Sequence, residues 1–181
     1  MQKLTIYLCC FIFVTVITNV LNPFTEYAME NSPYVEEGEK VGQETETEVP
    51  SQPWTDEEVI VLTKMLWGEA GSVPSDTEKA AVVWCALNHV DAGYGDIITA
   101  VTIPGHFVGY RENNPVDADL KRLCEDVLSR WYAEKDGKTD VGRVLPKDYI
   151  YFSGDGTRNY FRNTYEGGDR WDWSLPSPYE S

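Results

Sequence analysis

The chain carries little positive charge: its 181 residues include 15 lysines and arginines against 30 aspartates and glutamates, a net charge of −15. A protein that follows a nucleic-acid backbone needs a stripe of basic residues along one face. The sequence contains no such stripe, so we do not expect a nucleic-acid partner.

Long apolar runs are absent except at the N-terminus, where one extends from Leu4 to Leu21 behind the basic Lys3. Residues 1–21 are therefore typical of a secretory signal peptide, although without an A-x-A site, or of an uncleaved membrane anchor. Both interpretations export the rest of the chain. Residues 22–53 carry eight glutamates against the single base Lys40, which predicts a disordered acidic linker. The globular domain is expected over residues 54–181.

Cysteine and histidine are scarce, with four and two copies. Cys85 and His89 have helical i, i+4 spacing, but no second ligand pair accompanies them, which argues against zinc. Export would permit a disulfide between Cys85 and Cys124, yet their apolar helical surroundings favour buried free thiols over a disulfide or a nucleophile. Ser153 does not fit a nucleophile elbow, since Tyr151 stands where the first glycine is needed. We expect no metal and no cofactor.

Helical patterns dominate the domain. The first helix begins with a capping box from Thr55 to Glu58, after which apolar residues recur at helical spacing. A second capping box, from Ser75 to Glu78, begins a mostly apolar helix that should be the central buried one. A short helix is predicted at about 96–102.

The remaining segments are less regular. Residues 117–133 show one apolar face and predict a fourth helix. Only residues 149–152 have the composition of a strand. Residues 137–146 are expected to be an exposed turn region, and the glycine- and proline-containing tail to be a loop. The fold class is therefore α+β, a small and mainly helical domain with a minor β element.

The most informative motif, Trp67-Gly68-Glu69-Ala70, closes the first predicted helix. Glu69 lies near the apolar stripe and near a helix C-terminus, and both surroundings disfavour a carboxylate. Its pKa should therefore be raised, which is what a general acid for glycosidic cleavage needs. The alternative is a surface glutamate in a helix-terminating turn.

Further segments follow this motif in order: Gly71-Ser72-Val73-Pro74, Ala80-Ala81-Val82-Val83, Leu87-Asn88-His89-Val90, Pro104-Gly105-His106-Phe107, and Tyr149-Ile150-Tyr151-Phe152 with Asn159 and Phe161. Together, over about Trp54 to Phe161, they resemble the SleB/CwlJ-type cell wall hydrolases, the spore cortex-lytic enzyme family. The chain departs from the family pattern at two places. Gly71 and Val73 stand where the family commonly has Arg and a second Glu, and His106 stands where it usually has Gln.

The resemblance implies a lysozyme-like domain that cleaves the MurNAc–GlcNAc β-1,4 bond of peptidoglycan, with Glu69 as the one catalytic residue. Glu69 would act as general acid and then as base on the muramoyl 6-hydroxyl, which makes the protein a lytic transglycosylase. A muramidase is the alternative, and it needs a partner carboxylate about 5 Å or roughly 6.5–9.5 Å away. No such partner stands out in the sequence. An inactive wall-binding module is a third interpretation.

Six residues are expected to bind the glycan: His106, Phe107, Tyr151, Ser153, Asn159 and Tyr160. For the last four the reason is that aromatic rings stack on sugars and short polar side chains bind hydroxyls. His106 is expected to hydrogen-bond the N-acetyl group or to tune Glu69, and the alternative is a half-exposed loop histidine. Of the alternating Tyr151 and Phe152, one must belong to the core. Asn88 is expected either to orient the turn that carries Glu69 or to act as a cap. The expected partner is peptidoglycan, bound by a monomer that is secreted or anchored facing the cell wall.

Overall fold

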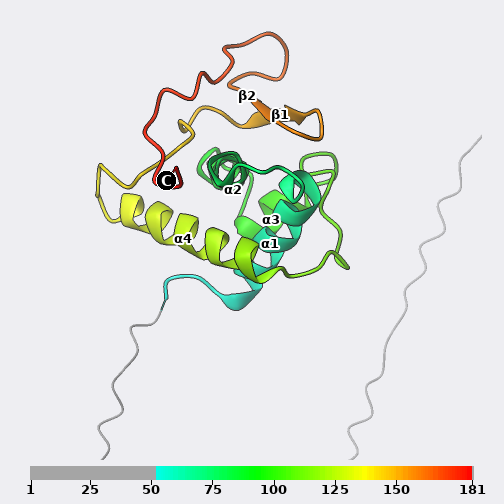
Figure 1. Cartoon of the computed structure of the whole chain (residues 1–181). Helices are drawn as coiled ribbons and strands as arrows, with labels where there is room; N and C mark the ends of the chain where they lie inside the picture. Colours follow the sequence, from blue (N-terminus) through cyan, green and yellow to red (C-terminus); the bar gives the residue numbers. More distant parts are fainter. Residues whose placement is uncertain (1–51, 181) are drawn as a thin grey trace, which may run out of the picture. The chain divides into compact units, whose positions relative to one another are not determined.

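The structure, a computed structural model, describes residues 52–180, which form an α+β domain of four helices and one small sheet (Figure 1). The elements in chain order are α1 (Asp56–Ala70), α2 (Asp76–Asp91), α3 (Ile97–Thr102), α4 (Ala118–Lys135), β1 (Tyr151–Gly154) and β2 (Asn159–Arg162). The predicted signal peptide or anchor, and the acidic linker up to residue 51, lie outside the described residues. Within residues 52–180 no helix is long and apolar enough to cross a membrane.

Helix α1 begins as the sequence predicts. The Thr55 side chain accepts the Glu58 N–H, and the Glu58 carboxylate accepts the Thr55 N–H at 2.7 Å, which confirms the capping box. The apolar stripe at Leu62, Met65 and Leu66 is completely buried. This stripe fixes the rotation of α1 and so decides where its last turn, which carries Glu69, points.

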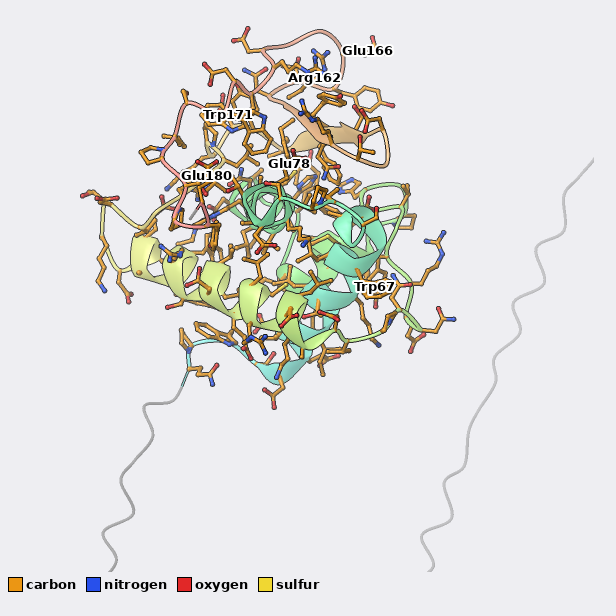
Figure 2. The ribbon with its side chains drawn as sticks, viewed as in Figure 1. Trp67, Glu78, Arg162, Glu166, Trp171 and Glu180 are labelled. Atoms are coloured by element: carbon orange, nitrogen blue, oxygen red, sulfur yellow. The ribbon has the colours of Figure 1, made fainter. Side chains whose placement is uncertain are left out.

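Helix α2 is the central helix, buried at every position from Ala80 to His89 and packed against α1, α3 and α4. In the view of Figure 1, α4 lies below it and the two strands lie above it. The second capping box is wrong. Ser75 accepts the Glu78 N–H, but the Glu78 carboxylate accepts the backbone N–H of Asn159 at 2.9 Å instead of turning back. Glu78 therefore joins the first turn of α2 to β2 (Figure 2).

The two other helices begin at aspartate caps. Asp96 accepts the Thr99 N–H before α3, and Asp117 accepts the Leu120 N–H before α4. Helix α4 ends two residues later than predicted, at Lys135. The thiols expected on α2 and α4, Cys85 and Cys124, are free and buried, as predicted.

The sheet is an antiparallel hairpin in which Tyr151 pairs with Arg162 and Gly154 with Asn159. Strand β1 starts at Tyr151, two residues later than the sequence predicts. Its partner β2 lies in the tail, which the sequence predicts to be a loop. Phe152 is the residue that packs against the core, stacking on Phe161 with ring centroids 5.5 Å apart. The neighbouring Tyr151 faces the other way, toward Tyr165.

The prediction of an exposed turn over residues 137–146 is wrong for its second half, where Val141, Val144 and Leu145 are buried. Arg143 holds this segment in place. Its guanidinium donates to both Glu134 carboxylate oxygens, at 2.7 and 3.2 Å, and lies 4.0 Å above the Trp84 ring.

The buried Asn88 belongs to the same network and fills neither of its two predicted roles. Its Oδ1 accepts from Arg143 at 2.7 Å. Its Nδ2 donates to the carbonyls of Pro146 and Tyr149, at 2.8 and 2.9 Å. Asn88 therefore connects the middle of the domain to the segment that enters β1.

Candidate active site

Glu69 lies in the last turn of α1, where its side chain is half-buried. Its Oε1 accepts the backbone N–H of Gly109 at 2.5 Å. Gly109 belongs to the loop after α3, 40 positions away, so this contact is a tertiary one. The carboxylate is thus held between the end of α1 and a crossing loop.

Burial raises the pKa of Glu69, and this effect exceeds the two that lower it, the Gly109 hydrogen bond and the charge of Arg111. The direction is the one predicted from the apolar stripe. The guanidinium of Arg111 is fixed near the carboxylate by its hydrogen bonds to the Val108 and Tyr110 carbonyls, at 2.5 and 2.6 Å. Glu69 therefore favours its protonated form more than an exposed glutamate does, and it has a cation nearby when it ionises.

A shallow hollow of about 360 Å³ opens at this turn and is lined by residues 67–72, Glu69 included. Trp67, at its edge, is 43% exposed, which is high for a tryptophan (Figure 2). Ser72, at the other edge, donates to the Gly156 carbonyl at 3.3 Å in the turn between β1 and β2. The Glu69 side chain is therefore neither sealed in the core nor free in bulk solvent.

A larger depression of about 620 Å³, which we name the aromatic groove, lies between α2, the loop after α3 and the hairpin. Its lining is His89, Tyr94, Gly105, His106, Phe107, Ile150, Tyr151, Phe152, Ser153, Arg162, Tyr165 and Glu166. Figure 2 shows Arg162 and Glu166 at the side of the molecule remote from α4. Four of the six predicted groove residues, His106, Phe107, Tyr151 and Ser153, come together here, whereas Glu69 lines the separate hollow at the end of α1.

The remaining two, Asn159 and Tyr160, line a separate hollow of about 240 Å³ with Glu78 and Trp173. Asn159 is 3% exposed, and its Nδ2 has no hydrogen-bond partner among residues 52–180. The Tyr160 hydroxyl donates to Asp155 at 2.8 Å. Neither residue lines the aromatic groove, although Tyr160 is the cross-strand neighbour of Ser153 in the hairpin.

Two histidines meet in the aromatic groove, with ring centroids 5.1 Å apart. His89 Nδ1 donates to the Cys85 carbonyl at 2.9 Å, so a neutral ring leaves Nε2 as an acceptor. Burial, aided by the electrostatic influence of His106 and opposed by the hydrogen bond to the Cys85 carbonyl, lowers the pKa of His89 and so favours its neutral form. His106 Nδ1 is buried without a partner in the described part of the chain.

The geometry gives no support to a cysteine nucleophile or to a metal site among the described residues. Burial raises the pKa of the Cys85 thiol, the opposite of what a cysteine nucleophile requires. Within residues 52–180, no three His, Cys, Asp or Glu side chains gather as ligands for a metal ion.

Four residues of the aromatic groove are not predicted from the sequence, namely Tyr94, Arg162, Tyr165 and Glu166. Tyr94 follows α2 in a glycine-containing turn, and the other three lie at or beyond the unpredicted strand β2. Without that strand, nothing in the local pattern places them near His106.

Comparison with known protein families, with curated protein sequences and with solved structures found no match to this chain.

The raised pKa of Glu69 predicts a pH-dependent cost to stability. Because the folded pKa lies above the ordinary value of 4.5, folding takes up a proton, and stability falls as the pH rises from 4.5 through the folded pKa. Glu69→Gln removes a carboxylate that is partly desolvated, so we expect it to melt at a higher temperature than wild type at neutral pH. The gain should vanish below 4.5, where both forms are uncharged.

Thermal unfolding by calorimetry at both pH values measures this difference. Glu57→Gln, an exposed glutamate on the same helix, is the matched control and should show no comparable gain. A Glu69→Gln protein that is less stable than wild type at neutral pH would contradict the prediction.

Proposed function

We propose that the protein cleaves the MurNAc–GlcNAc β-1,4 bond of peptidoglycan as a lytic transglycosylase, with Glu69 as its single catalytic residue. The observation that carries the proposal is the state of this side chain. Glu69 is buried enough for its pKa to be raised, yet it lines a hollow that is open at the surface. The order of motifs along the chain, which resembles the SleB/CwlJ-type hydrolases, supplies the substrate, and the domain would be of the lysozyme-like kind.

The hydrogen bond from Gly109 indicates which oxygen would donate the proton. Oε1 accepts that N–H, so in the acid form it is the carbonyl oxygen, and the proton resides on Oε2. Oε2–H would protonate the glycosidic oxygen as the bond to muramoyl C1 breaks. The resulting carboxylate would accept the proton of the muramoyl 6-hydroxyl while O6 bonds to C1. The 1,6-anhydro ring closes, and Glu69 recovers its proton without consuming water.

One carboxylate suffices for this reaction, and the surroundings of Glu69 agree with that. Among the described residues, the groups that shift its pKa are the Gly109 amide and the Arg111 guanidinium, and neither is a second carboxylate. A muramidase would need such a partner within roughly 5–9.5 Å. The charge of Arg111 would help to stabilise the Glu69 carboxylate midway through the reaction.

The aromatic groove would hold the glycan strand. Phe107 lines the groove, and Gly109, two residues later, donates its N–H to Glu69. The same short loop therefore contributes to the aromatic groove and contacts the proposed catalytic carboxylate. Tyr151 and His106 offer ring faces, while Ser153 and the His89 Nε2 offer polar atoms for hydroxyl or amide groups. With this substrate the protein would act outside the cytoplasm, secreted or anchored through its N-terminus.

Product analysis tests the proposal. The purified protein is incubated with purified peptidoglycan, and the released fragments are identified by mass spectrometry. We expect muropeptides with 1,6-anhydromuramoyl ends. Reducing muramoyl ends would indicate a muramidase, and binding without release would indicate a wall-binding module. Either result would overturn the transglycosylase assignment.

A further inference from the structure

The loop after α3 crosses α1 at a point where both backbones are glycine. A Cβ added to Gly68 would lie 1.8 Å from the Gly109 carbonyl oxygen, and one added to Gly109 would lie 2.4 Å from the Gly68 carbonyl carbon. No side chain fits at either position, so the two segments touch backbone to backbone. This close approach brings the Gly109 N–H within reach of Glu69.

Asn114 fastens this crossing from the outside. Its Nδ2 donates to the Gly109 carbonyl and to the Lys64 carbonyl of α1, each at 2.9 Å. The same nitrogen is the side-chain atom nearest to the missing Cβ of Gly68, at 2.8 Å. One amide group therefore bridges the helix and the loop at the point where they meet.

A second hydrogen bond also joins α1 to the loop after α3. Lys64 Nζ donates to the Glu112 carbonyl at 2.6 Å, but this bond is exposed, whereas the Asn114 bonds are partly buried. Exposed bonds made by lysine contribute little because water competes for both partners. Asn114 is therefore the stronger of the two ties.

We infer that Asn114 is a positioning residue for Glu69. By holding the Gly109 carbonyl against α1, it aims the N–H of the same residue at Glu69 Oε1. That contact fixes the carboxyl group and leaves Oε2 as the proton-bearing oxygen. Asn114 donates to backbone carbonyls, does not line the aromatic groove, and acts on Glu69 through the backbone of Gly109, whose carbonyl it binds and whose N–H Glu69 accepts. The catalytic importance of this arrangement rests on the proposed function, whereas the arrangement itself can be tested without substrate.

The test is an NMR titration of the full chain, following the Glu69 carboxyl carbon and the Gly109 amide proton. In wild type, the Gly109 amide should shift with the pKa of Glu69, because its acceptor gains and loses charge. In Asn114→Ala the Gly109 bond weakens, and since that bond lowers the pKa of Glu69, the pKa should rise further. Asn113→Ala, an exposed neighbour of the same type, is the matched control and should leave both signals unchanged.

Asn114→Ser keeps one donor and should lie between wild type and Asn114→Ala, which provides a second variant should alanine prevent folding. On peptidoglycan, a misplaced acid lowers turnover by up to about 100-fold, so kcat should fall in Asn114→Ala with KM nearly unchanged. Equal Glu69 pKa values in wild type and both Asn114 variants would overturn the inference, as would a Gly109 amide that ignores Glu69. If the titrations behave as expected but no fragments are released by wild type, the positioning role stands and the proposed function fails.

Discussion

Glu69→Gln is expected to lower the release of muropeptides from peptidoglycan by about 10²- to 10⁴-fold, the usual contribution of a general acid–base residue. Glutamine keeps the shape of the side chain and can still accept the Gly109 N–H, so the site should remain assembled. What it lacks is a transferable proton. Release is measured by chromatography of soluble fragments under conditions in which wild type is limiting.

Two comparisons make this result specific. Glu57→Gln alters an exposed glutamate of the same helix and should release fragments at the wild-type rate. Glu69→Gln should still sediment with insoluble peptidoglycan, because the aromatic groove is unchanged. Equal release by wild type and Glu69→Gln would exclude Glu69 as the catalytic residue. A loss of sedimentation together with activity would mean that Glu69 serves binding.

The largest effect on stability is expected at Arg143. Its side chain is 10% exposed and that of its partner Glu134 is 15% exposed, so this ion pair is nearly buried. Arg143→Ala leaves Glu134 with the exposed Lys147 as its one ion-pair partner among residues 52–180, removes the donor to Asn88 Oδ1 and uncovers the Trp84 ring. Breaking one partner of a buried pair costs about 3–5 kcal/mol, and because Lys147 still compensates in part, we expect about 3 kcal/mol.

Urea denaturation of wild type and Arg143→Ala measures this cost. Arg122→Ala is the matched control, since Arg122 pairs with Asp119 on the surface, its side chain 70% exposed. Exposed pairs contribute at most about 1 kcal/mol, so the control should remain close to wild type. Arg143→Lys keeps the charge but not the fork-shaped donor set, so its loss of stability should lie between those of Arg122→Ala and Arg143→Ala. Equal losses for Arg143→Ala and Arg122→Ala would contradict the prediction.

The helices follow from local signals. Thr55, Asp96 and Asp117 each place a side-chain acceptor before a run with helical apolar spacing, and each does cap a helix. The mismatch at Glu78 shows the limit of such signals. The spacing of a capping box is present, but a stronger partner, the Asn159 amide, arrives from elsewhere in the fold.

The parts that could not be predicted depend on distant partners. Asn159 and Arg162 are not typical strand residues, and β2 forms because Phe161 stacks on Phe152 while Glu78 binds its first amide. Likewise, the buried state of residues 141–145 depends on partners of Arg143 that come from α2 and α4. No window of local sequence contains these contacts.

The candidate site divides in the same way. The direction of the Glu69 pKa shift agrees with the prediction from the apolar stripe of α1, although its cause is burial of a side chain that also contacts the crossing loop. The contacts of Glu69 with Gly109 and Arg111 could not be predicted, because both residues belong to a loop about 40 positions later in the sequence. The groove residues at and beyond β2 could not be predicted either, because their positions depend on β2, which forms through contacts with distant residues.

The bond between Glu78 and the Asn159 amide joins positions 81 residues apart, and it is one of the ties that keep the hairpin on the helices. Contacts of such separation form late in folding, because the intervening chain must be ordered first. The four helices can therefore assemble before one wall of the aromatic groove exists. Until the hairpin docks, the domain would hold Glu69 in the last turn of α1 while still lacking part of the proposed glycan-binding surface, so the proposed cleavage would require the docked hairpin.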